Sequence, residues 1–383
     1  MDSSLSQESN SNLTENSDLT ANNPPPEKTE QSSDNLGKSS PQHLPKKSSK
    51  FSLKKIIIIA AVLVVGVLLF TYFHDTGKSK TPTKVYKVGI LDGLQTYFGG
   101  SVTGFEQGMT SLGYIQGKNI TYIVKNEGLT GNQAIFKQFI RDKVNLVVTL
   151  PTEPTEEGEA VLKGSDVPLL SMDASLEGTN IINSIQKPGH NITGVRYPGP
   201  EDSVERLVIL HQLAPNDTHI LVPYLADYPN VPGQLAALRT EAQTLGLTLI
   251  AEPISATETS SYVSGLSASN PGFDAITTMA EPFSVTPAMN EPLYNFANLH
   301  SIPISGSSLN NNDTGPIAYV APNSITVGQL AAPLAVKIFN GSAAGTLPIL
   351  TPTSDIGINL LVAQPLGITP DQGLLSIASK VIR

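Results

Sequence analysis

The feature that most constrains the fold of this chain is an alternation of strand-like and helix-like segments, which occurs twice within residues 84–383. In the first half, segments with helical periodicity separate four apolar runs at 85–91, 119–124, 144–150 and 167–172. These runs are apolar at consecutive positions, which is typical of strands buried on both faces of a parallel sheet. The first half therefore predicts a doubly wound α/β layout.

The same pattern starts again after Pro198-Gly199-Pro200. The expected helices lie at 202–213, 232–245, 258–268, 287–299 and 324–339, and the expected strands at 219–224, 247–251, 274–279, 302–305 and 317–320. The repetition predicts two doubly wound, Rossmann-like lobes with a hinge and a central cleft. Because ligands of open parallel sheets bind beyond the carboxyl ends of the strands, we expect the functional site in this cleft.

The chain is expected to cross between the lobes more than once, near 195–200 and 320–324. We assign residues 84–197 plus 324–350 to lobe 1 and residues 198–323 plus 351–383 to lobe 2.

A glycine-rich segment from Gly99 to Gly104 follows the first predicted strand. Thr103 and Glu106 have the spacing of a capping box, which predicts that a helix begins near this point. The glycines do not match the G-x-G-x-x-G fingerprint of a dinucleotide site. The alternative to nucleotide binding is a ligand-facing loop whose backbone amides suit a carboxylate.

Charge and composition exclude several classes of protein. The chain has 24 Lys+Arg against 33 Asp+Glu, a net charge of −9, which disfavours a protein that follows nucleic-acid phosphates. It has no cysteine, which excludes a disulfide framework, a thiolate nucleophile and a cysteine zinc site. The six histidines have no metal-binding spacing, and there is no G-x-S-x-G motif. We therefore expect no metal, no cofactor and no enzymatic activity.

A cluster of glutamates is the one group that resembles acid/base chemistry. Glu153, Glu156, Glu157 and Glu159 follow the third predicted strand. The favoured interpretation is a solvated first helical turn, where acidic side chains interact well with the helix dipole. A glycosidase-like pair of carboxyl groups is the alternative, and no further motif supports it.

The N-terminal residues differ sharply from the rest of the chain. Residues 1–53 are rich in Ser, Asn, Pro and charge, and we expect them to be a disordered cytoplasmic tail. Residues 54–73 contain an uncharged run from Ile56 to Phe73, which as a helix spans about 27 Å, close to the hydrocarbon thickness of a bilayer. Lysines precede it and no small-residue cleavage site follows, so we expect one transmembrane signal anchor. A buried core helix is the alternative. Residues 74–83 form a linker.

Two stretches together carry a family resemblance. They are the segment GFEQGMTSLGYIQGKNI at 104–120 and the segment KPGHNITGV at 187–195. With them, the globular part resembles substrate-binding proteins of ABC transporters of the tryptophan/tyrosine-uptake type. The resemblance implies a type I periplasmic-binding-protein fold, in which two lobes close on a small solute and deliver it to a permease.

The resemblance also implies a set of ligand-binding positions on the loops that face the cleft. They are Asp92, Tyr97, Pro151, Thr152, Asp173, Tyr224, Glu281, Pro282, Phe283, Gly306, Ser307 and Asn323. Asn323 stands where we expect an acidic residue for the α-amino group of an amino acid, and a neutral amide pairs an ammonium less strongly. Structural alternatives are a turn cap for Asp173, lobe packing for Tyr224 and Phe283, and a helix N-cap for Asn323.

We therefore expect a solute-binding protein of an ABC importer, held in the cell membrane by a single N-terminal helix, with its binding domain outside the cytoplasm. Its expected partners are a small solute, which an amino acid would fit, and ABC permease subunits, with no nucleic acid. The alternatives are a ligand-sensing receptor of the same fold and an enzyme built on two α/β lobes. A solute that binds without turnover would separate the first two from the third.

Overall fold

The structure is a computed structural model that describes residues 84–266, 272–308 and 314–383. The predicted tail, transmembrane anchor and linker lie outside the described residues. Within the part of the chain that is described, no helix is long and apolar enough to cross a membrane.

Lobe 1 is built on a five-stranded, wholly parallel sheet with the strand order β2-β1-β3-β4-β5. Its strands are β1 (Tyr86–Asp92), β2 (Ile120–Asn126), β3 (Leu146–Leu150), β4 (Leu169–Ala174) and β5 (Ile192–Arg196). Its helices are α2 (Gln95–Ser111), α3 (Gln133–Arg141), α4 (Thr152–Leu162), α10 (Ser324–Phe339) and the short 3-10 helix η1 (Ala344–Thr346). β1, β3, β4 and β5 are buried almost throughout, as consecutive apolar positions predict.

Lobe 2 is built on a seven-stranded sheet with the strand order β12-β11-β10-β9-β8-β6-β7. Its strands are β6 (His219–Leu225), β7 (Thr248–Ile254), β8 (Ala275–Thr277), β9 (Ile304–Gly306), β10 (Ala318–Pro322), β11 (Ser354–Asn359) and β12 (Lys380–Ile382). Its helices are α5 (Gly199–Leu213), α6 (Val231–Leu245), α7 (Thr259–Gly265), α8 (Pro282–Val285), α9 (Pro287–Leu299), α11 (Leu360–Ala363) and α12 (Gln372–Ile377). β11 pairs with β10 in antiparallel orientation, so this sheet is mixed, whereas the sequence pattern predicts a parallel one.

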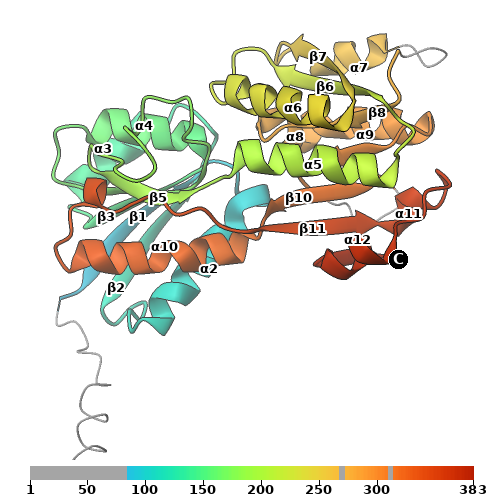
Figure 1. The fold of residues 1–383 in the computed structure, drawn as a ribbon. Helices are drawn as coiled ribbons and strands as arrows, with labels where there is room; N and C mark the ends of the chain where they lie inside the picture. The colour runs from blue at the N-terminus through green and yellow to red at the C-terminus, as the bar shows by residue number, and fades with distance from the viewer. Residues whose placement is uncertain (1–83, 267–271, 309–313) are drawn as a thin grey trace, which may run out of the picture. The chain divides into compact units, whose positions relative to one another are not determined.

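The chain crosses between the lobes at three places: after β5, between β10 and α10, and before β11. In Figure 1, α10, drawn in orange, therefore lies among the blue and green elements of lobe 1, beside α2. Leu350 continues this return by bridging to Val195 of β5 before the chain enters lobe 2 at β11. The double α/β layout with several crossings is the bilobal arrangement that the repeated pattern predicts.

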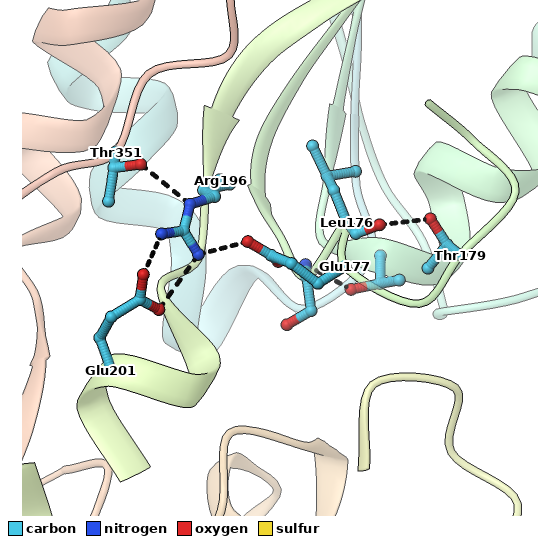
Figure 2. A network of polar contacts seen from close by, with 8 residues as sticks. Leu176, Glu177, Thr179, Arg196, Glu201 and Thr351 are labelled. Carbon is cyan, nitrogen blue, oxygen red and sulfur yellow. Dashed lines mark hydrogen bonds and ion pairs between the residues drawn. The ribbon is translucent and has the colours of Figure 1, made fainter. Parts of the chain in front are cut away.

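Arg196 connects two of these crossings (Figure 2). Its guanidinium lies at the end of β5 and donates to the carboxylates of Glu177 and Glu201, the second of which belongs to the first turn of α5. Its Nε donates to the hydroxyl of Thr351, 2.9 Å away on the third crossing. One side chain from lobe 1 thus ties the start of α5 to the segment that leads back to lobe 2 before β11.

The predicted glycine-rich loop and capping box are wrong. Residues 99–104 lie inside α2, which begins at Gln95 and has Leu94 at its N-cap. The glycines serve helix packing, because a Cβ added at Gly104 would lie 2.1 Å from the carbonyl oxygen of Ile325 in α10. Gly328 of α10 has the reciprocal constraint against Ser101 of α2, at 2.0 Å. The two helices approach so closely that only glycine fits.

Other boundaries agree or differ for identifiable reasons. The bounds of α9 and α10 are those predicted, and Gly246 ends α6 in the left-handed conformation. The short strands β11 and β12 were not predicted. They form one edge of the lobe 2 sheet. The first three residues of β11 are only half-buried, so its sequence lacks the continuous apolar run that would have predicted a strand.

Candidate functional site

A pocket lies where the carboxyl ends of strands from both sheets meet, as expected for open α/β sheets. It is lined by Leu94, Phe98, Leu129, Pro151, Thr152, Glu153, Asp173, Ser175 and Tyr197 from lobe 1 and its first crossing, and by Tyr228, Ala280, Glu281, Pro282 and Val285 from lobe 2. It encloses about 380 Å³ of space between atoms, part of it open to solvent.

Asp173 is the most constrained polar residue of the pocket. It is only 4% exposed and sits at an irregularity in the pairing of β4 with β5, with φ at +56°, in the left-handed region that few non-glycine residues adopt. The hydroxyl of Ser101 donates to its Oδ2 at 2.6 Å. Burial, with a smaller contribution from Asp92, raises the pKa of Asp173 to about 7. Such local strain is typical of functional positions.

Glu281 is the equivalent carboxyl group on lobe 2. It is 4% exposed, and its Oε2 accepts a 2.9 Å hydrogen bond from the backbone N–H of Leu225, at the end of β6. Its Oε1 is buried and has no hydrogen-bond partner. Burial raises the pKa of Glu281 to about 8. One oxygen of this pocket-lining carboxyl group is therefore without a partner and can accept a hydrogen bond when the group is ionised.

Two further carboxyl groups lie in or next to the pocket, Glu153 in its lining and Asp92 close to Asp173. Glu153, in the first turn of α4, lines the pocket with a buried Oε2 that accepts no hydrogen bond, and burial raises its pKa. Asp92 is fully buried at the end of β1, where its Oδ1 accepts from the N–H of Leu94 at 3.1 Å and its Oδ2 has no partner. Lys, Arg and His are absent from the described residues that line the pocket. The site is thus acidic without an internal counter-ion.

The remaining walls are mostly apolar and aromatic, from Leu94, Phe98, Tyr197, Tyr228 and Val285. Among the small polar groups, the hydroxyl of Thr152 already accepts a 3.0 Å hydrogen bond from the N–H of Ser175. The pocket therefore suits a small molecule with a cationic end and an apolar body.

Five of the twelve residues proposed from the family resemblance line this pocket: Pro151, Thr152, Asp173, Glu281 and Pro282. The other seven lie elsewhere in the described structure. Asp92 is close enough to Asp173 to raise its pKa, Phe283 is buried in an apolar core of lobe 2, and Tyr224 packs against another. Gly306 is the last residue of β9, where its backbone approaches the hydroxyl of Tyr294.

Asn323 has the N-cap role. Its Oδ1 accepts from the N–H of Thr326 at 3.2 Å, and its Nδ2 donates to Asp355 at 3.2 Å. It is exposed and does not line the pocket, so its neutral side chain does not count against a cationic ligand. Tyr97 and Ser307 contact each other across the two lobes.

Several lining residues were not predicted. Glu153 was interpreted as part of a solvated helical turn, whereas it lines the pocket and its Oε2 is buried without a hydrogen-bond partner. Two other glutamates of that cluster have structural partners: Glu157 accepts from the backbone N–H groups of Gly131 and Asn132, both at 2.7 Å, and Glu159 pairs with His190 at 2.9 Å. Tyr228 and Ser175 follow strand ends, a position that could have indicated them, although nothing in their local sequence does.

A metal centre is not indicated. Across the residues that the structure describes, no group of three or more His, Asp or Glu side chains is arranged to hold a metal ion.

Comparison with known proteins gives the family. The family model described as ABC transporter substrate binding protein matches residues 98–382, most of the chain. The chain belongs to this family. A relative named tyrosine-binding protein, from Clostridioides difficile strain R20291, is 25% identical over 311 residues, which cover 78% of this chain and 88% of that protein. The expected resemblance to substrate-binding proteins of ABC transporters is confirmed.

Solved structures share the fold. An ABC domain from Streptococcus pneumonia in complex with L-Trp is 22% identical, with a TM-score of 0.68, over 78% of this chain and 100% of that chain. A ligand-free, open substrate binding protein with adhesive properties from Clostridium difficile is 23% identical, with a TM-score of 0.61, over 78% of this chain and 99% of that one. The bilobal periplasmic-binding-protein-like fold is therefore confirmed.

Proposed function

We propose that this substrate-binding protein captures an amino acid with an apolar or aromatic side chain in the pocket between its lobes. The observation that carries the proposal is the pair of nearly buried carboxyl groups, Asp173 on lobe 1 and Glu281 on lobe 2, in a pocket whose described lining supplies no cation.

The physical argument is one of desolvation. A carboxylate removed from water is strongly disfavoured unless it is paired, which is why the pKa values of Asp173 and Glu281 rise to about 7 and about 8. An ammonium group bound in the pocket would stabilise the ionised form of each carboxyl group that it contacts, and it would offer a hydrogen-bond donor to Oε1 of Glu281. A cationic end of the solute therefore completes the site.

The apolar part of the solute would contact the other walls. Phe98, Tyr197 and Tyr228 offer aromatic surface, and Leu94 and Val285 offer aliphatic surface. Relatives named for tyrosine binding, or solved with L-Trp, support this solute class. We therefore propose L-tyrosine and L-tryptophan as the first solutes to test.

Lobe closure would couple capture to transport. Because both lobes line the pocket, a solute would enter when the lobes are apart and would be enclosed when they meet. We propose that the solute selects the closed form and that the closed form docks on an ABC permease, without catalysis.

The binding experiment uses a property of the sequence. Because the chain has no tryptophan, the fluorescence of L-tryptophan itself reports its transfer into the pocket. Calorimetry with L-tyrosine, and with 3-(4-hydroxyphenyl)propionate, which lacks the ammonium group, then tests the role of the carboxyl groups. We expect binding of the amino acids and none of the analogue. Equal binding of the analogue would refute the assignment of Asp173 and Glu281.

A pair of matched variants separates the site from general charge effects. Asp173→Asn should weaken the affinity for L-tryptophan about 10- to 100-fold, because it removes a charge-assisted hydrogen bond. Asp166→Asn removes one carboxylate from an exposed position of the same lobe and should leave the affinity unchanged. Equal affinities of the two variants would remove Asp173 from the site.

We further propose that residues 56–73 anchor the protein in the cell membrane, with the binding domain outside the cytoplasm. The support is the uncharged apolar run and the lysines that precede it. Since the chain has no cysteine, Arg239→Cys, at an exposed position of α6, introduces a single thiol. A membrane-impermeant maleimide should label this thiol in intact cells, and labelling only after lysis would contradict the proposed orientation.

A further inference from the structure

Tyr97 connects the two lobes and does not line the pocket. It lies in the first turn of α2, on lobe 1, between Leu94 and Phe98, which do line the pocket. Its hydroxyl donates a 2.8 Å hydrogen bond to the carbonyl oxygen of Ser307, which follows β9 on lobe 2. Its ring packs edge-on against Phe98, with ring centroids 4.7 Å apart.

The acceptor side of this contact is fixed. Ser307 is almost fully buried, and its hydroxyl is hydrogen-bonded to that of Ser284 at 2.9 Å. Ser284 in turn donates to the carbonyl oxygen of Glu281, the pocket carboxyl residue of lobe 2, at 3.0 Å. Two hydrogen bonds thus link the side chain of Ser307 to the backbone of Glu281.

A buried cation lies on the same side. Arg206 of α5 is fully buried and donates to the carbonyl oxygens of Val320 and Thr278, at 2.7 and 3.1 Å. It also donates to the hydroxyl of Tyr197, on the first crossing, at 3.0 Å. Tyr97 is close enough to Arg206 and Tyr197 for both to influence its ionisation. The Tyr97 hydroxyl therefore inserts into a polar cluster of the other lobe and the hinge.

The Tyr97–Ser307 contact depends on the position of the lobes, because its donor and acceptor belong to separate sheets. Opening the lobes breaks it, whereas hydrogen bonds within either lobe are unaffected. We infer that Tyr97 is a positioning residue that sets the lifetime of the closed form, and hence the dissociation rate of the solute, without contacting the solute itself. This inference rests on the proposed function only for the solute measurement described next.

The test uses a matched pair of variants. Tyr97→Phe removes one hydroxyl and keeps the ring. Tyr86→Phe removes the same group from a hydroxyl that donates to the carbonyl oxygen of Phe339 at 3.3 Å, entirely within lobe 1. In stopped flow, bound L-tryptophan is displaced by excess L-tyrosine. We expect Tyr97→Phe to raise the dissociation rate about 2- to 10-fold and to leave the association rate nearly unchanged, the range that the loss of one neutral hydrogen bond gives.

A second measurement needs no solute. Lys137→Cys on α3 and Arg239→Cys on α6 place one spin label on each lobe of the full-length chain, at exposed positions and without competing thiols. We expect the distribution of distances between the labels to shift toward the open form in Tyr97→Phe and to stay at the parental distribution in Tyr86→Phe.

The outcomes distinguish this inference from the proposed function. Failure of the parental protein to bind either amino acid overturns the proposed solute class, while the label distances still test Tyr97. If Tyr97→Phe and Tyr86→Phe give the same label distances, and the same dissociation rate where solute binds, then the hydroxyl of Tyr97 has only a structural role and the inference is wrong.

Discussion

The raised pKa values in the pocket predict a steep and specific pH dependence of solute binding. A protonated carboxyl group cannot pair with an ammonium, so each group must lose its proton before it can bind. With a pKa of about 7, Asp173 is mostly protonated at pH 6 and mostly ionised at pH 8. This group alone makes binding about tenfold weaker at pH 6 than at pH 8. Glu281, with a pKa of about 8, adds a factor of about 50 over the same interval if it too must ionise.

The expected ratio of affinities between pH 8 and pH 6 therefore lies between about 10 and about 500, and the value identifies how many carboxyl groups contact the ammonium. Calorimetry at pH 7 in buffers of different ionisation enthalpy should show protons released on binding, because the ammonium lowers the pKa of each carboxyl group that it contacts. Asp173→Asn should remove the tenfold part of the ratio, whereas Asp166→Asn should leave the whole ratio intact.

The stability of the solute-free protein should respond in the opposite direction. A carboxyl group whose pKa is higher in the folded than in the unfolded chain favours folding when it is protonated. The contribution of Asp173 and Glu281 is therefore largest near pH 4 and is lost as the pH rises to about 7 and about 8.

An affinity for the solute that is flat or falls between pH 6 and pH 8, with no release of protons, would show that these carboxyl groups ionise before the solute arrives. That result would refute the predicted pH dependence of binding.

Two further predictions concern the fold. Arg196→Ala should lower the free energy of unfolding by about 1–2 kcal/mol. This is less than the loss expected for a fully buried ion pair, because the glutamate partners of Arg196 are partly exposed. The control Arg141→Ala, on the surface of α3, should change the free energy of unfolding little. Gly104→Ala should cost about 1–3 kcal/mol through overpacking against α10, and Gly233→Ala, where a Cβ meets open space, should be neutral or stabilising. Denaturant titration of each variant and its control measures these free energies of unfolding. Equal losses of stability within a pair would contradict the contact proposed for Arg196 or for Gly104.

The sequence by itself determined the layers of this protein and its family. Consecutive apolar residues in β1, β3 and β4 could form only strands buried on both faces, and their alternation with helices predicts parallel sheets in two lobes. The bounds of α9 and α10 could also be predicted from the sequence, because each helix begins after a residue suited to its N-terminus. These features depend on short-range patterns, which a sequence shows directly.

Only the tertiary structure decided which polar side chains share the pocket. Glu281 is more than 100 residues from Asp173 and Glu153 in the chain, and the burial of the three carboxyl groups, with the unpaired oxygens of Glu153 and Glu281, depends on the folded structure around them. The roles of Tyr97 and of Gly104 also follow from contacts made more than 200 residues away along the chain. Local residue patterns fix which segments form strands and helices, whereas the environment of a carboxyl group depends on all the atoms that exclude water from it.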